Sequence, residues 1–306
     1  MSRRRARGRD VNGILLLDKA AGATSNSVLQ QVKRLMGANK AGHTGSLDPI
    51  ATGVLPICLG EATKLSGYLL DADKGYDVTI RLGVKTSTGD IEGDVLAEHS
   101  VPKVSDEYLS EVLERFTGDI YQIPPMYSAL KKEGQPLYKL ARKGIEVERE
   151  ARPVTIYELV LRGRTEDTLD LSVLCSKGTY IRTLAEDIGE VLGCGAHVAV
   201  LRRTKAGTFT LSDTHTMGEL ELLKAESFSG LDAAMLPLDA AISDWNKVNL
   251  TADMAYYIVR GQAVQVPKAP TQGMVSLYQG DDEFLGIGYI LDDGRVAPKR
   301  LVAESK

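Results

Sequence analysis

The segment from residue 41 to residue 60 constrains the fold more than any other part of the chain. Its turn-forming residues are Gly42, Gly45, Pro49, Gly53, Pro56 and Gly60. Glycine adopts backbone conformations that are closed to other residues, and proline fixes φ and removes an amide donor. We therefore predict a shaped loop with short structured pieces here, and no long regular element.

Asp48 lies at the centre of this segment, before Pro49 and two residues after Ser46. The proline biases Asp48 toward an extended backbone. A carboxylate held at a rigid loop tip can act as a nucleophile or a general base. It can equally cap the following turn, because Asp-Pro often opens turns, and the spacing alone favours that structural role. The neighbouring His43 and two small hydroxyls favour a site that approaches another molecule closely.

The chain has 306 residues, of which 43% are hydrophobic and 25% are charged. This length and composition predict one large core and a small accessory domain. The apolar runs 14–17 and 54–59 are far shorter than the ~20 residues that span a bilayer. The apolar stretch after the N-terminal arginines is also too short for a signal peptide. We therefore expect a cytoplasmic protein without a membrane segment.

The cysteines and histidines argue against a metal site. The three cysteines, Cys58, Cys175 and Cys194, form no Cys-x-x-Cys pair, and we expect them to be buried thiols. The four histidines lie far apart and have no zinc-site spacing. The glycine-rich motifs for dinucleotides and nucleoside triphosphates are absent, as is Gly-x-Ser-x-Gly. Redox, kinase and serine-hydrolase functions are therefore disfavoured.

The net charge of −4 argues weakly against a nucleic-acid partner, but its distribution is uneven. Residues 1–10 carry five arginines, and further basic residues gather at 131–143 and 202–205. Phosphate binding requires such local positive charge. Any one of these clusters is as consistent with a solvated charged face.

Hydrophobic periodicity indicates a mixture of helices and strands. The expected strands are 13–18, 76–84, 155–162 and 168–175, and the expected helices are 28–36, 105–116 and 180–192. Candidate N-cap residues lie at 24–27 and at Ser105. The stretch between Pro125 and Pro153 is rich in charged residues and glycine, which predicts an inserted, exposed excursion. From residue 249 onward, short apolar pieces at 263–267, 274–278 and 285–290 predict a compact all-β module of roughly 55 residues.

The stretch from Gly42 to Lys64, GHTGSLDPIATGVLPICLGEATK, resembles the signature of the TruB family of tRNA pseudouridine synthases without a gap. Further pieces of the family pattern agree in order and spacing: 12–19, 22–25, 74–76, 81–83, 122–131, 175–182 and 194–203. The resemblance covers nearly the whole chain. It implies a mixed α/β (α+β) pseudouridine synthase fold with a central, largely antiparallel sheet. It also implies a basic arm at 1–10, a catalytic domain at 11–246 with an RNA-clamping insertion at 127–152, and a C-terminal PUA-like β-barrel at 249–306.

The family's activity sets the functional expectation. The resemblance implies that the enzyme isomerises uridine to pseudouridine at position 55 in the T-loop of tRNA, and that it flips the target base out of the stack. Substrate and product are isomers, so no cofactor and no metal are expected. The expected partner is the T-stem loop of tRNA. We expect a monomer that requires no protein partner.

Three residues match the catalytic set of the family: Asp48, Tyr76 and Arg182. The resemblance implies that Arg182 pairs with Asp48, which would hold the carboxylate ionised and oriented. It also implies that Tyr76 stacks on the target base and takes part in proton transfer. Without the resemblance, Tyr76 would be interpreted as a core aromatic residue and Arg182 as a surface charge.

Four further residues match substrate-binding positions. His43 matches the residue that contacts RNA in place of the displaced bases, and Tyr180 and Leu201 match residues that line the uracil pocket. Lys19 matches a lysine that supports the active-site loop. The sequence departs from the family here, because Ala20 stands where the family usually has proline, which removes rigidity but no chemical group. The insertion at 127–152 has seven Lys and Arg against four Glu, a net +3 that suits phosphates.

Two other functions fit the same residues. A synthase guided by a separate RNA would have a similar catalytic core and PUA module, but the insertion at 127–152 is expected only in the stand-alone enzymes. A non-catalytic RNA chaperone would use the basic surface and the PUA module. The intact set of Asp48, Tyr76 and Arg182 argues against a loss of catalysis.

Overall fold

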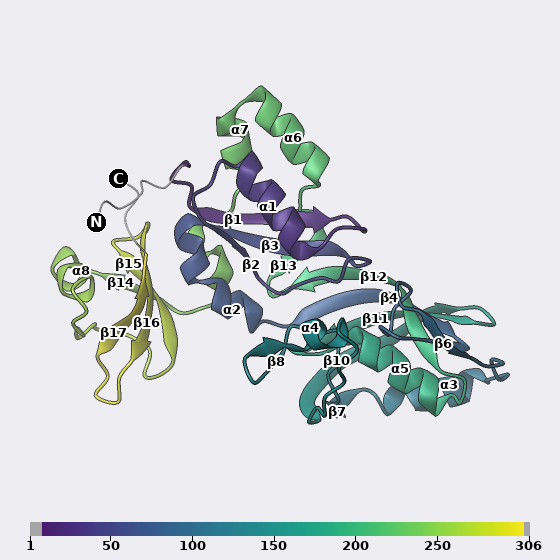
Figure 1. Cartoon of the computed structure of the whole chain (residues 1–306). Coiled ribbons are helices and arrows are strands. Elements are labelled where there is room, and N and C mark those ends of the chain that lie inside the picture. Colours follow the sequence, from purple (N-terminus) through teal and green to yellow (C-terminus); the bar gives the residue numbers. More distant parts are fainter. Residues whose placement is uncertain (1–7, 303–306) are drawn as a thin grey trace.

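The computed structural model describes residues 8–302 and contains one large sheet and one small sheet (Figure 1). The order of the main strands in the large sheet is β1 (Gly13–Lys19), β3 (Thr52–Leu59), β12 (Ala196–Ala206), β4 (Lys74–Leu82), β11 (Thr168–Cys175), β10 (Arg152–Arg164) and β7 (Gly118–Gln122). Short strands β2 (Ala41–His43) and β13 (Phe209–Thr210) pair with β3 and β12. All these pairs are antiparallel except β3 with β12. The prediction of a mixed α/β fold with a largely antiparallel central sheet is confirmed.

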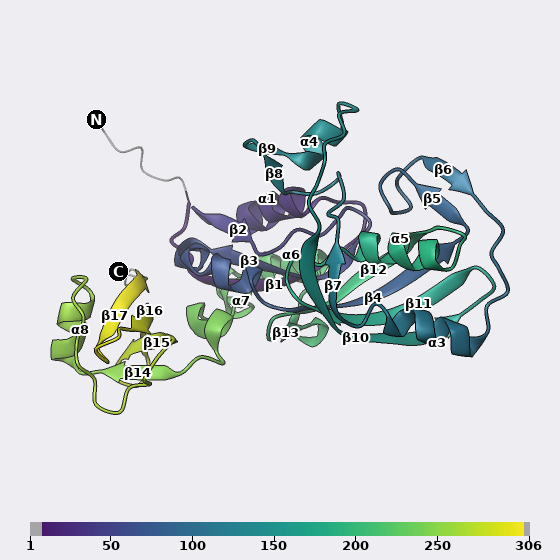
Figure 2. The same ribbon diagram turned by 90° about the horizontal axis from the view of Figure 1, so that it is seen from below.

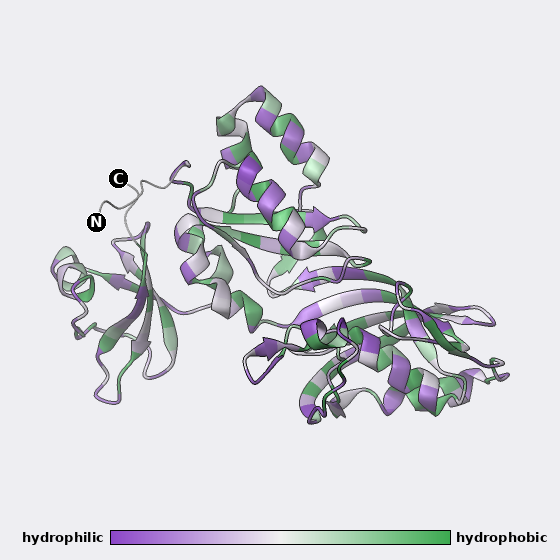
Figure 3. Cartoon of the chain, viewed as in Figure 1, coloured by the Kyte–Doolittle hydropathy of each residue, from purple (hydrophilic) through white to green (hydrophobic). Residues whose placement is uncertain are grey.

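The three predicted helices are present as α1 (Ser25–Leu35), α3 (Asp106–Glu114) and α5 (Ile181–Val191). Thr24 begins α1 because its hydroxyl accepts the amide N–H of Ser27. Ser105 caps α3 in the same way. Apolar residues of all three helices pack into the core of the large sheet. Figure 3 shows polar and apolar bands alternating along the helices, while hydrophobic residues run along β1 and β3.

The prediction that residues 41–60 contain no long regular element is wrong, because β3 is an eight-residue, almost completely buried strand. Two features allow a strand with this composition. Gly53 has φ +101°, and a Cβ there would lie 2.1 Å from the carbonyl oxygen of Arg203 on β12, so only glycine permits the crossing. Pro56 pairs with Leu16 of β1 on one side, and on its other side its carbonyl oxygen accepts the N–H of Thr44. The amide that it lacks would point to that other side, between the places where β2 and β12 pair with β3.

The remaining elements of the catalytic domain are short. They are η1 (Gly60–Lys64), α2 (Ser66–Leu70), β5 (Val84–Thr86), β6 (Val95–Glu98), η2 (Leu211–Asp213), α6 (Met217–Glu226), α7 (Phe228–Ala233) and η3 (Leu238–Ile242). The helices α6 and α7 pack against each other, and α6 also contacts α1 and β1. Among the residues described, no helix is both long enough and apolar enough to cross a membrane. The three cysteines are free and buried, as predicted.

The charged insertion stands away from the large sheet, on the side that also carries α1 (Figure 2). It contains the two-stranded ladder of β8 (Lys131–Lys132) and β9 (Gln135–Pro136), followed by α4 (Leu137–Ala141). Most of its side chains from residue 131 to residue 152 are exposed or half-buried. The prediction of an exposed excursion is therefore confirmed.

The C-terminal module is built on a four-stranded sheet of β14 (Lys247–Leu250), β15 (Met274–Gln279), β16 (Glu283–Ile290) and β17 (Val296–Leu301). The prediction of an all-β module is wrong in one respect, because α8 (Ala252–Ile258) lies between β14 and β15 and packs on the module's core. Thr251 caps this helix, and that signal was present in the sequence. The expected strand at 263–267 is also absent; only Val264 forms a bridge, to Val296.

Apolar contacts join the module to the catalytic domain. Leu65 and Ile242 of the catalytic domain cluster with Ile287 of the module, and all three are buried. Within the catalytic domain, Tyr68 packs edge-on against Trp245, which lies just before β14, with ring centroids 5.1 Å apart. The amino group of Lys64 also donates a hydrogen bond to the carbonyl oxygen of Leu301. The predicted domain boundaries remain predictions, and residues 1–7 of the predicted arm lie outside the described residues.

Candidate active site

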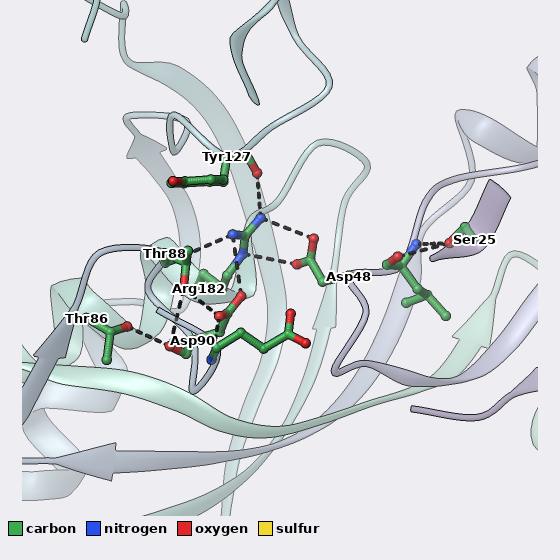
Figure 4. Close-up of polar contacts among 9 residues, drawn as sticks. Ser25, Asp48, Thr86, Thr88, Asp90, Tyr127 and Arg182 are labelled. Atoms are coloured by element: carbon green, nitrogen blue, oxygen red, sulfur yellow. Dashed lines mark hydrogen bonds and ion pairs between the residues drawn. The ribbon is translucent and has the colours of Figure 1, made fainter. Parts of the chain in front are cut away.

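Asp48 and Arg182 lie in contact although 134 residues separate them in the sequence (Figure 4). The Nε of Arg182 is 3.0 Å from one carboxylate oxygen of Asp48, and Nη2 donates to the other oxygen at 3.3 Å. Such two-point contacts fix orientation as well as charge. The side chain of Arg182 is 7% exposed and that of Asp48 is 36% exposed. The carboxylate is therefore held from behind and remains open on its other side.

Burial raises the pKa of the Asp48 carboxyl above its ordinary value. The positive charge of Arg182 opposes this shift, whereas the nearby Asp90 adds to it. Arg182 therefore favours the ionised form of Asp48 in a site where burial disfavours it. No group of three or more metal-binding side chains occurs within residues 8–302.

Asp90 is a second acidic partner of Arg182, and our sequence interpretation missed it. Its carboxylate lies 3.6 Å from Nη1 of Arg182 and is 4% exposed. The hydroxyl of Thr88 and the backbone N–H of Glu92 both donate to the same carboxylate oxygen, at 2.5 and 3.1 Å. The signal in the sequence is the repeated Gly-Asp at 89–90 and 93–94, which by itself is typical of turns. In the structure this turn carries the carboxylate of Asp90, which is buried and hydrogen-bonded.

Lys19 and Ser25 hold the loop that carries Asp48. The amino group of Lys19, which is 0% exposed, donates to the carbonyl oxygens of Ala20, Ala23 and Pro49. The Ser25 hydroxyl accepts the N–H of Leu47 and donates to its carbonyl oxygen, at 2.8 and 2.9 Å. Both residues flanking Asp48 are thereby fixed.

Tyr76 and Leu201 lie on one face of the sheet. Leu201 pairs with Val78, and Arg203 pairs with Tyr76, in the β12–β4 ladder. Residues two apart share a face, so these four side chains lie together on it. Burial raises the pKa of the Tyr76 hydroxyl, and the neighbouring charge of Arg203 partly offsets the shift. Tyr76 therefore stays protonated at neutral pH.

Arg203 is 1% exposed and ties the loop to the sheet. Its Nε donates to the carbonyl oxygen of Val54 at 2.8 Å, and Nη2 donates to that of Gly45 at 3.2 Å. The sequence suggested that Arg203 belongs to a basic surface cluster. The structure places it inside the protein, where it supports residues before and after Asp48.

Tyr180 immediately precedes α5, which begins with no side-chain cap of its own. The amide side chain of Gln122 instead fixes the backbone of Tyr180 itself: its oxygen accepts the N–H of Tyr180 at 2.9 Å, and its nitrogen donates to the carbonyl oxygen of Tyr180 at 3.2 Å. Gln122 is 1% exposed. The charge of Asp48 contributes to raising the pKa of the Tyr180 hydroxyl, after burial itself, so Tyr180 lies within electrostatic range of the carboxylate.

His43 ends β2 and pairs with Ile57 across the ladder. Its Nδ1 is buried and has no hydrogen-bond partner within the described part of the chain. Burial and the charge of Arg203 both lower the pKa of the imidazole, so His43 is neutral at pH 7. An unpaired ring nitrogen costs free energy unless another molecule satisfies it.

The insertion touches the candidate site directly. The carbonyl oxygen of Tyr127, the first residue of the insertion, accepts a hydrogen bond of 2.7 Å from Nη2 of Arg182. Near the other end, Arg149 donates to the carbonyl oxygen of Pro124 at 3.1 Å. The first residue of the insertion thus contacts the guanidinium that holds Asp48, and its other end is tied to Pro124, three residues before Tyr127.

Models of known protein families match successive parts of the chain. Residues 33–181 match the TruB family pseudouridylate synthase N-terminal domain. Residues 182–243 match the tRNA pseudouridylate synthase B C-terminal domain, and residues 247–302 match the pseudouridine synthase II TruB C-terminal model. A tRNA pseudouridine synthase B from Nitrosococcus oceani is 54% identical and covers 98% of this chain and 97% of its own. The chain belongs to the TruB family of pseudouridine synthases. A relative of the same name from Ectopseudomonas mendocina is 57% identical, with 96% of each chain covered.

Solved structures agree on the fold of this TruB family member. A chain in an H/ACA ribonucleoprotein bound to a substrate RNA containing 2′-deoxyuridine matches with a TM-score of 0.74 at 22% identity, over 99% of this chain and 92% of that chain. A chain in a Cbf5-Nop10-Gar1 complex matches with a TM-score of 0.73 at 26% identity, over 96% and 84%. The family models and the relatives at 54% and 57% identity show that the chain is an enzyme of the pseudouridine synthase class.

Proposed function

We propose that this enzyme converts uridine 55 in the T-loop of tRNA to pseudouridine, with Asp48 as the catalytic carboxylate. The observation that carries the proposal is the contact between Asp48 and Arg182, because it presents a carboxylate that is oriented from one side and open to a substrate on the other. The high identity to relatives named tRNA pseudouridine synthase B supports the choice of tRNA as substrate. The site lies within the TruB family models, in line with this chemistry.

The reaction is an isomerisation, so the atoms balance without a co-reactant. The bond between N1 of uracil and C1′ of the ribose breaks, a bond between C5 and C1′ forms, and the hydrogen on C5 is replaced by one on N1. Asp48 serves either by attacking C1′ or by assisting loss of the 2′ proton. Both routes require the ionised carboxylate, which Arg182 favours.

Tyr76, Tyr180 and Leu201 form the proposed receptacle for the flipped base. Tyr76 and Leu201 share a face of the sheet, and Tyr180 lies within electrostatic range of Asp48. A phenol ring stacks on a base, and its protonated hydroxyl can pass or receive a proton. His43 is proposed to fill the space that the flipped base leaves, since its buried Nδ1 offers an unused hydrogen-bonding atom.

The insertion at 127–152 is proposed to clamp the T-stem loop. Its net charge of +3 suits phosphates, and it projects on the side of the sheet that carries α1. Because Tyr127 contacts Arg182, a clamped insertion would also steady the Asp48–Arg182 pair. An insertion that clamps the T-stem loop would let the enzyme act on tRNA without a guide RNA.

Asp48→Asn tests the catalytic role. We expect it to abolish tritium release from 5-tritiated uridine in tRNA while tRNA affinity stays within about twofold, because the amide keeps the shape but lacks the charge. Asp77→Asn is the matched control, since Asp77 is an exposed carboxylate on β4 beside Tyr76. Normal turnover by Asp48→Asn would refute the proposed role.

A second experiment tests the substrate. Purified protein alone should modify a bare T-stem-loop transcript, and pseudouridine mapping should place the product at position 55. A requirement for added guide RNA, or a product at another position, would contradict the proposal. Full cellular complementation by Asp48→Asn in a deletion strain would instead make RNA chaperoning the principal function.

A further inference from the structure

A groove of about 600 Å³ lies outside the candidate active site, against the C-terminal half of α1. The side chains that line it are Arg9, Gln30, Lys33, Arg34 and Phe228, together with the backbone at residues 37–38. Within residues 8–302, no carboxylate lines this groove. It is therefore a concave surface with positive charge and hydrogen-bond donors.

Arg9 is fixed in the groove before any partner arrives. Its guanidinium lies 4.1 Å from the centre of the Phe228 ring and pairs with Asp232 behind the groove. It also donates to the carbonyl oxygen of Met36, at 3.3 Å. Phe228 is 43% exposed, which is high for phenylalanine, and Lys224 approaches the same ring. The ring thus holds two cations at the groove edge.

Lys33 and Arg34 supply positive charges that are not paired within the described chain. Both lie in the last turn of α1, where basic residues are favoured by the helix dipole alone. Neither side chain forms a hydrogen bond or an ion pair with another residue of the described chain. Their donors are therefore available to an anion. Three cations, Arg9, Lys33 and Arg34, line the groove, Lys224 lies at the Phe228 ring beside it, and Asp232 pairs with Arg9.

The groove and the active-site loop lie at opposite ends of one helix. Ser25, at the start of α1, is hydrogen-bonded to Leu47 beside Asp48. Lys33 and Arg34 follow Ser25 by eight and nine residues, or about 12–14 Å along the helix axis. In Figure 2, α1 and the insertion lie on the same side of the central sheet.

We propose that this groove binds phosphates of the substrate RNA at a distance from the flipped base. The inference rests on the proposed function, because it supposes that RNA is held at Asp48. The negatively charged backbone of an RNA that is bound at the active-site loop, at one end of α1, can also contact the basic groove at the other end. The site contributes affinity and register, and it leaves the chemical step unchanged.

The test compares Lys33→Gln/Arg34→Gln with the matched control Lys103→Gln/Arg115→Gln. The control removes the same charge from two exposed residues that flank α3. Binding to unmodified tRNA is measured at several salt concentrations, and single-turnover tritium release is measured at saturating enzyme. Glutamine is a good helix former, so α1 should persist, and circular dichroism checks this.

The groove variant should bind tRNA on the order of tenfold more weakly at moderate salt, and the slope of log K against log salt should fall by about 2. Its single-turnover rate at saturation should match the unaltered enzyme. Unchanged affinity and slope, or an equal loss in the control, would overturn the proposal. Affinity and tritium release are separate measurements. Failure of the proposed isomerisation would therefore be seen by itself, as a lack of tritium release by the unaltered enzyme.

Discussion

The carboxylate of Asp90 lies 3.6 Å from the guanidinium of Arg182, on a side chain that is 4% exposed. Arg182 therefore bridges two acidic residues, of which only Asp48 is open to a substrate. The other contacts of the guanidinium are the carbonyl oxygens of Thr88 and Tyr127. Each nitrogen of Arg182 thus has a fixed partner, and the orientation of Asp48 depends on all of them.

Asp90→Asn should lower kcat on the order of 10- to 100-fold, which corresponds to about 1.4–2.7 kcal/mol in the barrier. The amide keeps the shape but removes one of the two charges that hold Arg182, so Asp48 is less well oriented. Tritium release under single-turnover conditions measures the effect, and filter binding checks that tRNA affinity is retained. Asp94→Asn, an exposed acid of the same hairpin, is the control and should be silent. A silent Asp90→Asn would mean that the charge of Asp90 is not needed to orient Arg182.

The pH profile should report the Asp48–Arg182 pair. Burial raises the pKa of Asp48 and Arg182 opposes the shift. Because the ionised carboxylate is the proposed active form, kcat/KM should fall as the pH drops through a value above the ordinary 3.8. In Arg182→Met the opposing charge is lost, so the acid limb should move to higher pH.

Two further variants control this measurement. Arg182→Lys keeps the charge, so its acid limb should stay close to that of the unaltered enzyme, while kcat falls because the two-point contact is lost. Arg81→Met removes an exposed arginine that pairs with Asp167 and should leave the profile unchanged. An acid limb that does not move in Arg182→Met would show that Arg182 does not set the ionisation of Asp48.

Gln122→Met should reduce both stability and turnover. It removes the acceptor and the donor that fix the backbone of Tyr180. The N–H of Tyr180 is then left unpaired, at about 1–3 kcal/mol, whereas the carbonyl oxygen keeps the hydrogen bond from the N–H of Leu184. The start of α5 would loosen, and Arg182 lies two residues later. Urea unfolding and the separate changes in kcat and KM measure the two effects.

Gln122→Glu is the second variant, because it keeps the acceptor and loses the donor. It should recover part of the turnover. Gln31→Met, an exposed position on α1, is the control. If Gln122→Met lost stability but kept kcat and KM, Gln122 would have a structural role only.

Gly53→Ala should destabilise the fold by about 3 kcal/mol or more, because the new Cβ would lie 2.1 Å from the carbonyl oxygen of Arg203 at φ +101°. Relief of that clash would have to separate β3 from β12. Gly67→Ala is the control: no atom lies within 4 Å of a Cβ there, φ is ordinary, and the residue is in α2. It should be neutral or stabilising by up to about 1 kcal/mol. The free energy of unfolding is measured in urea. Equal values for Gly53→Ala and Gly67→Ala would contradict the argument.

Local sequence patterns predicted the elements whose signals are local. Thr24 and Ser105 cap helices where expected, because an N-cap interacts with amides only a few residues away. The alternation of apolar and polar residues in β4 and β11 indicated half-buried strands, because this pattern also depends only on residues that are close in the chain. β3 was mispredicted because Gly53 and Pro56 are compatible with a strand only through the positions of β2 and β12, which come from other parts of the chain.

By itself the sequence determined the residue types of the site: a carboxylate beside a proline, a tyrosine that begins a strand, and an arginine that begins a helix. The family resemblance added the expectation that Asp48 and Arg182 meet. Only the tertiary structure decided which groups surround that pair, because Asp90, Tyr127 and Gln122 reach the site through sheet register and loop closure. Arg203 is the clearest case, since its charge suggested the surface and β12 carries it into the interior, where backbone carbonyls accept its hydrogen bonds.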